Sequence, residues 1–165
     1  MYEAHFGLRS PPFHITPDPG LLFLTPGHQE ALGTVLYGIL GRKGFVLLTG
    51  EVGTGKTTVL RRALEHFPAD QAEVIYVLQP VLTPGDFLRM LQRELAGEDE
   101  VLDAASDLDA VVADIQKRLI ARHRKGRIVV IAIDEAQTMP PEALETLRLL
   151  SNLETATEKL LQIVL

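Results

Sequence analysis

Apolar and polar positions follow two patterns along this chain, and together they predict alternating helices and strands. In the helical segments, apolar residues recur every three or four positions, and glycine or proline marks several of the ends. These segments are residues 26–41, 56–67, 84–96, 108–124 and 141–153. Short, continuous apolar runs predict buried strands over residues 45–49, 74–78, 128–133 and 160–165. Strands that alternate with helices indicate an α/β fold with a parallel sheet flanked by helices.

The first 27 residues differ from the rest of the chain. They contain five of the ten prolines, together with Phe6, Phe13 and Phe23. We interpret residues 1–27 as an irregular arm anchored by its aromatic side chains, and residues 28–165 as one folded domain. The chain stops inside its last apolar run, so we expect it to be the N-terminal part of a longer protein, incomplete after the fourth strand.

Composition and charge exclude several kinds of site and disfavour one kind of partner. The 165 residues contain no cysteine, which excludes disulfides, cysteine-ligated metal centres and thiol chemistry. The net charge of −6 weighs against a large basic surface for nucleic acid, although a local basic patch remains possible. No apolar run approaches the roughly 20 residues of a membrane span, and the N-terminus does not resemble a signal peptide. We therefore expect a cytoplasmic location.

A glycine-rich motif lies between the first predicted strand and the helix that follows. Residues 50–57 read GEVGTGKT and match the phosphate-loop pattern GxxxxGK[ST]. Gly53 and Gly55 allow positive φ, so that successive backbone N–H groups can surround phosphate oxygens. Lys56 is expected to bind the β- and γ-phosphates, and Thr57 to bind Mg²⁺. The predicted nucleotide-binding residues here are Gly50, Glu51, Val52, Gly53, Thr54, Gly55, Lys56, Thr57 and Thr58.

Two acidic residues follow the third predicted strand. Asp134 and Glu135 come directly after the apolar run 128–133, at the carboxyl end of a strand, where parallel sheets bind ligands. Asp134 is expected to hold Mg²⁺ through a water molecule, and Glu135 to accept a proton from an attacking water. The predicted catalytic residues are Lys56 and Glu135, and the predicted magnesium ligands are Thr57 and Asp134.

These motifs, together with the opening segment, resemble a known family. Residues 2–32, the motif at 50–58 and the IDEAQ sequence at 133–137 are similar to the ExeA/GspA-type ATPases of the general secretion pathway, within the wider AAA+ class. The resemblance implies a P-loop NTPase fold of five strands, four of them present here. It also implies ATP hydrolysis that drives assembly or export of a secretion-pathway component, often in a homo-oligomeric ring.

The resemblance carries further expectations about the site and its surroundings. Leu24 and His28 correspond to the region where related ATPases hold adenine, so the arm is expected to pack near the nucleotide. Some members continue into a membrane span, which makes attachment to the inner membrane and a membrane-protein partner possible. An arginine finger, a sensor residue and a lid would follow Leu165, and we therefore expect slow turnover from these 165 residues alone.

The sequence leaves several alternative functions open. A DNA-associated AAA+ helper of the transposition type fits the same motifs, although the net charge disfavours a nucleic-acid partner. A P-loop kinase is disfavoured by the adjacent acids Asp134 and Glu135. A module that keeps its nucleotide as a structural ligand is a further alternative. Gln137 could sense the γ-phosphate, contact a neighbouring subunit or serve only as a loop residue.

Overall fold

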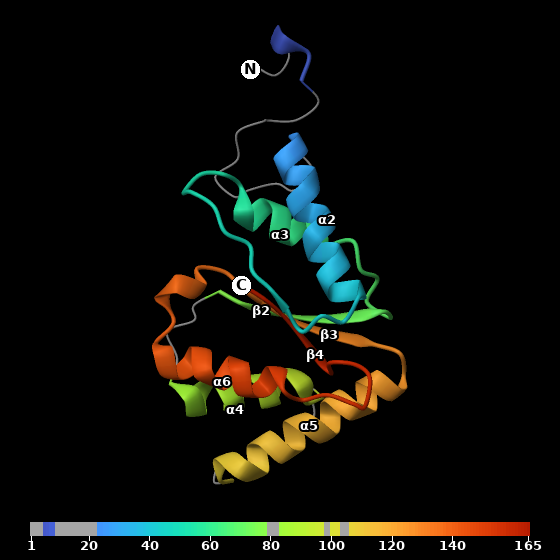
Figure 1. The fold of residues 1–165 in the computed structure, drawn as a ribbon, viewed down its shortest axis with the longest axis vertical. Helices are drawn as coiled ribbons and strands as arrows, with labels where there is room; N and C mark the ends of the chain where they lie inside the picture. Colours follow the sequence, from blue (N-terminus) through green and yellow to red (C-terminus); the bar gives the residue numbers. More distant parts are fainter. Residues whose placement is uncertain (1–4, 9–22, 79–82, 98–99, 103–105) are drawn as a thin grey trace.

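A parallel sheet forms the centre of the molecule (Figure 1). It has four strands, in the order β1-β4-β3-β2. The computed structural model describes residues 5–8, 23–78, 83–97, 100–102 and 106–165. The strands are β1 (Phe45–Val46), β2 (Ala72–Val77), β3 (Ile128–Ile133) and β4 (Leu161–Val164). All three strand pairs are parallel, so the four carboxyl ends lie along one edge of the sheet. The predicted α/β fold is confirmed.

Helices cover both faces of this sheet. One face carries α2 (Pro26–Leu40) and α3 (Lys56–Leu64), and the other carries α4 (Pro84–Leu95), α5 (Leu108–Arg124) and α6 (Pro141–Ser151) (Figure 1). A short 3₁₀ helix, η2 (Ala136–Thr138), follows β3. Threonine side chains cap α2 and α4 ahead of a proline at the first helical position, as the sequence predicts.

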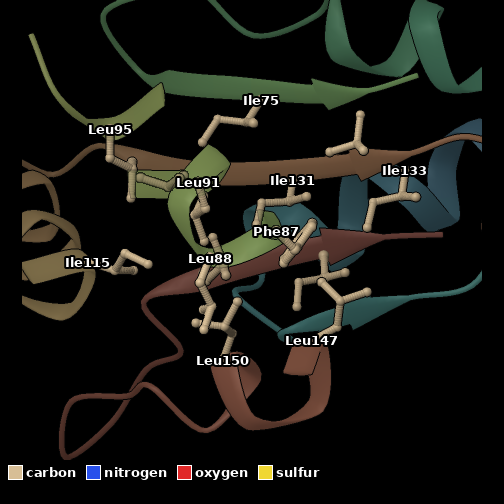
Figure 2. Close-up of a cluster of buried hydrophobic side chains, with 14 of the residues drawn as sticks. Ile75, Phe87, Leu88, Leu91, Leu95, Ile115, Ile131, Ile133, Leu147 and Leu150 are labelled. Carbon is tan, nitrogen blue, oxygen red and sulfur yellow. The ribbon is translucent and has the colours of Figure 1, made fainter. Parts of the chain in front are cut away.

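The central strand β3 supplies both hydrophobic cores. Alternate side chains point to opposite faces of a strand, so β3 contributes three residues to each layer. Ile131 packs with Phe87, Leu91 and Leu147 on the side of α4, α5 and α6 (Figure 2). Val130 packs with the α2–α3 layer on the other side. All six residues of β3 are buried, which confirms the prediction made from its continuous apolar run.

The first strand departs from its prediction. Phe45 is 41% exposed and Leu47 is 70% exposed, so the expectation of a buried strand over 45–49 was wrong. The cause is the position of β1 at the edge of the described sheet, where α2 covers only the face that holds Val46. The backbone nevertheless continues to pair beyond β1, since the Leu48 N–H donates to the Leu165 carbonyl at 2.8 Å.

The N-terminal arm is described only in part. Phe13 lies outside the described residues, and so does most of the segment that was expected to pack near the site. Phe6 and Phe23 are described and are 68% and 83% exposed, so neither one acts as the expected aromatic anchor. Within the described segments, no helix is long and apolar enough to cross a membrane.

Candidate functional site

The glycine-rich loop connects β1 to α3 in the conformation that its glycines permit. Gly53 and Gly55 have φ values of 82° and 81°, in the left-handed region that favours glycine. Gly55 is also the N-cap of α3, and no side chain caps this helix. The first N–H groups of a helix have no partner within the helix, and together they form a site for an anion.

The side chain of Lys56 closes this loop. Its Nζ donates hydrogen bonds to the carbonyls of Gly50 and Glu51, both at 2.9 Å. The Thr54 hydroxyl donates to the same Glu51 carbonyl at 2.8 Å. The loop is therefore held in its curved form by its own residues, and a positive charge lies against it.

A direct contact joins the loop to the acidic end of β3. The Thr57 hydroxyl, in the first turn of α3, donates to Oδ2 of Asp134 at 2.9 Å, across 77 positions of sequence. Hydroxyl and carboxylate oxygens are ligands that Mg²⁺ accepts. In the described part of the chain, no group of three or more His, Cys, Asp or Glu residues could hold a metal by itself. This pair suits a magnesium ion that takes its other ligands from elsewhere.

The neighbouring residue Glu135 has a strained backbone. Its φ of 54° and ψ of 37° lie in the left-handed region, which costs a non-glycine residue about 1–3 kcal/mol. Its N–H donates to Oδ1 of Asp134 at 3.0 Å, and its carbonyl accepts from the Thr138 N–H and hydroxyl at 2.9 and 2.8 Å. Its carboxylate accepts a hydrogen bond from the Gln137 amide. Such strain beside a candidate metal ligand is typical of functional sites.

One cavity of about 690 Å³ brings these groups together. It lies between the loop, the start of α3, the carboxyl end of β3 and Leu144 of α6. Most of the predicted site residues line it: Gly50, Val52, Gly53, Gly55, Lys56, Thr57, Thr58, Asp134 and Glu135. Gln137 also lines this cavity, whereas Glu51 and Thr54 contribute through hydrogen bonds within the loop.

A second cavity of about 330 Å³ lies between the loop and the start of α2. Its walls include Gly27, His28 and Ala31 from α2, and Thr54 and Lys56 from the loop and α3. His28 therefore lies beside the loop. Leu24 is partly buried but does not line either of these two cavities.

Tyr76 is a neighbour of this site that sequence reasoning missed. Burial raises the pKa of its phenol, Arg61 opposes this shift, and the negative charge of Asp134 adds to it. The Arg61 guanidinium carbon lies 5.9 Å from the centre of the Tyr76 ring. The phenol therefore stays protonated and uncharged beside the acidic end of β3. The sequence of residues 74–78 did not indicate that Tyr76 lies near Asp134, because a tyrosine within an apolar strand is typical of a core residue.

The chain is similar to a known family and to a known protein. Residues 39–165 match a family described as AAA domain. General secretion pathway protein A from Aeromonas hydrophila is 45% identical over 168 residues, which cover all of this chain and 29% of that protein. The chain thus spans less than a third of the length of this curated relative. No solved structure gives a significant match.

Proposed function

The chain belongs to the AAA domain family, and from that premise we propose that it binds ATP with Mg²⁺ and hydrolyses it. The observation that carries this proposal is the contact between Thr57 and Asp134. It brings the phosphate loop and the acidic strand end to one cavity, which is the arrangement that P-loop hydrolases use.

The triphosphate is proposed to lie in the loop. The backbone N–H groups around Gly53 and Gly55, with those of the first turn of α3, point at the phosphate oxygens and bind them. Lys56 exchanges its hydrogen bonds to the Gly50 and Glu51 carbonyls for the β- and γ-phosphates. The adenine base is proposed to lie near the second cavity, which His28 lines, with Leu24 close by in the segment before α2.

Thr57 and Asp134 are proposed to hold the magnesium ion, Thr57 directly and Asp134 through a water molecule. When bound, Mg²⁺ neutralises charge that develops on the phosphates. The Asp134 carboxylate already accepts a hydrogen bond from Thr57, so the pair needs little rearrangement to bind a cation.

Glu135 is proposed to be the general base. It takes a proton from a water molecule, whose oxygen forms a bond to the γ-phosphorus. The bond from that phosphorus to the β–γ bridging oxygen breaks, and ADP and inorganic phosphate are released. Gln137 donates to the Glu135 carboxylate, and so holds the base in one orientation until water and substrate are present.

The relative's name suggests the process that this ATPase serves. We propose that the nucleotide cycle drives assembly or export of a secretion-pathway component, with the protein acting as a homo-oligomeric ring at the inner membrane beside a membrane protein of the secretion apparatus. The net charge of −6 favours this role over a DNA-associated one.

The proposal is tested by titrating the full-length protein with a fluorescent ATP analogue, in Mg²⁺ and in EDTA. We expect tighter binding in Mg²⁺, and Asp134→Asn should remove that difference while leaving the affinity in EDTA unchanged. Equal affinity of the wild-type protein in both buffers would contradict the metal site. Failure to bind in either buffer would contradict the proposed function as a whole.

A further inference from the structure

The imidazole ring of His28 contacts three backbone groups, one in the phosphate loop and two in the segment before α2. Its Nε2 lies 2.9 Å from the carbonyl oxygen of Thr54, in the phosphate loop. Its Nδ1 lies 3.2 Å from the carbonyl oxygen of Phe23 and 3.4 Å from the N–H of Thr25. The ring therefore links the segment before α2, the first turn of α2 and the loop.

The chemistry of imidazole requires a proton on Nε2. With its proton there, the neutral ring donates to Thr54, and Nδ1 accepts from the Thr25 N–H. A doubly protonated ring also donates to Thr54, and its Nδ1–H donates to the Phe23 carbonyl. With a proton on Nδ1 alone, the lone pair of Nε2 would face a lone pair of the Thr54 oxygen, and the two would repel each other. The contact to the loop thus persists in both forms that the geometry allows.

This contact has a consequence for the anion site. The peptide between Thr54 and Gly55 is trans and planar, so its carbonyl and the Gly55 N–H point in opposite directions. Because His28 holds the carbonyl on the α2 side, the Gly55 N–H points away from α2. Gly55 is the N-cap of α3, and a Cβ there would lie 3.6 Å from Nε2 of His28, so the ring and the loop pack closely.

We propose that His28 is a positioning residue that fixes the Thr54–Gly55 peptide in its phosphate-binding orientation. This role rests on the proposed nucleotide binding and extends that proposal, because a residue of α2 would then hold the loop in its binding conformation. A loop that is already ordered loses less conformational entropy when the anion binds, and affinity rises accordingly. His28 does not line the cavity that holds Asp134 and Glu135, so we expect affinity to depend on the ring and the chemical step to be independent of it.

The test compares His28→Ala with His28→Gln in the full-length protein. Glutamine retains a donor for Thr54 and suits the third position of a capping box, whereas alanine loses both contacts. We expect His28→Ala to weaken Mg·ATP binding about three- to tenfold, the equivalent of one hydrogen bond, with kcat unchanged at saturating ATP. His28→Gln should restore most of the affinity. Should His28→Ala not fold, His28→Met, similar in length to glutamine but without a donor, takes its place.

Two controls distinguish this positioning role from a general loss of stability and from a contact with the base alone. Thr83→Ala removes the side-chain cap of α4, away from the loop, and should lower Tm without changing affinity. Inorganic tripolyphosphate, which has no base, should also bind more weakly to His28→Ala, because the loop is less ordered whether or not a base is present. A loss confined to ATP would limit His28 to the proposed contact with the base and overturn the inference.

Three further outcomes would also overturn the positioning role of His28: unchanged affinity in His28→Ala, no recovery in His28→Gln, or an equal loss of affinity in Thr83→Ala. These outcomes all presuppose a wild-type protein that binds Mg·ATP. A wild-type protein that binds no nucleotide would instead overturn the proposed function.

Discussion

The two adjacent acids after β3 have different partners. Asp134 accepts a hydrogen bond from Thr57, whereas the Glu135 carboxylate accepts one from Gln137. The left-handed backbone turns the chain at Glu135, and we propose separate tasks for the two carboxylates. Their position at the carboxyl end of a strand could be predicted from the sequence. The strain could not, because nothing in the DEAQ sequence requires a positive φ.

Substitution of Glu135 tests its task as a base. Glutamine keeps the size and polarity of the side chain but cannot accept the proton. We expect Glu135→Gln in the full-length protein to lower ATP turnover about 10²- to 10⁴-fold and to leave Mg·ATP binding intact. Steady-state phosphate release without an added acceptor measures the rate. Wild-type turnover in the variant would show that another group activates the water.

Two glycines of α2 make a matched pair for a packing test. A Cβ at Gly38 would lie 2.2 Å from Cγ2 of Val46, whereas one at Gly33 would meet nothing within 4 Å. Alanine improves helix propensity at either position by about 1 kcal/mol. We expect Gly33→Ala to stabilise the protein by up to that amount, and Gly38→Ala to destabilise it by about 1–3 kcal/mol because the overlap dominates. Urea unfolding measures both, and equal stabilisation would disprove close packing of α2 on β1.

At the scale of elements, an ionic network joins α4 to α5. Arg118 donates to Asp114 at 2.7 Å and to Glu100 at 2.8 Å, and Gln92 of α4 donates to Asp114 at 2.8 Å. Burial alone would raise the pKa of Asp114. The hydrogen bonds from Arg118 and Gln92 outweigh that effect, and the pKa lies below its ordinary value.

This shift predicts how stability depends on pH. Because the pKa of Asp114 is lower in the folded state, its carboxylate stabilises the fold fully above the unfolded pKa of about 3.9. That contribution is lost as the pH falls through the folded value. We expect the Tm advantage of the wild-type protein over Asp114→Asn to be constant from pH 7 to about 5 and to shrink below about 4. An advantage that stays the same down to pH 2.5 would contradict the network.

The elements themselves follow closely from local sequence signals. Threonine–proline pairs mark the starts of α2 and α4, and the continuous apolar run of β3 specifies a strand buried on both faces. The exposure of Phe45 and Leu47 was not predictable in this way. It depends on the position of β1 in the sheet order, which is a property of the assembled fold and not of the strand.

At the scale of the whole molecule, the site combines segments that are distant in sequence. The motifs predict that Thr57 and Asp134 share a ligand, but their contact forms only because β1 and β3 end on the same edge of the sheet. The link from His28 to Thr54 had no sequence signal, since it depends on how α2 lies against the loop. The positions of the motifs at the strand ends were therefore predictable, whereas the contacts around them required the fold.

The central claim is that this cavity binds Mg·ATP through the phosphate loop, and calorimetric titration of wild-type protein against Lys56→Ala tests it most directly. Lys125→Ala, at the end of α5, serves as the matched lysine control. We predict that wild-type protein and Lys125→Ala bind Mg·ATP equally, and that Lys56→Ala weakens binding about 10²-fold by removing charge-assisted hydrogen bonds to phosphate. Wild-type affinity in a folded Lys56→Ala variant would contradict the assignment of the site.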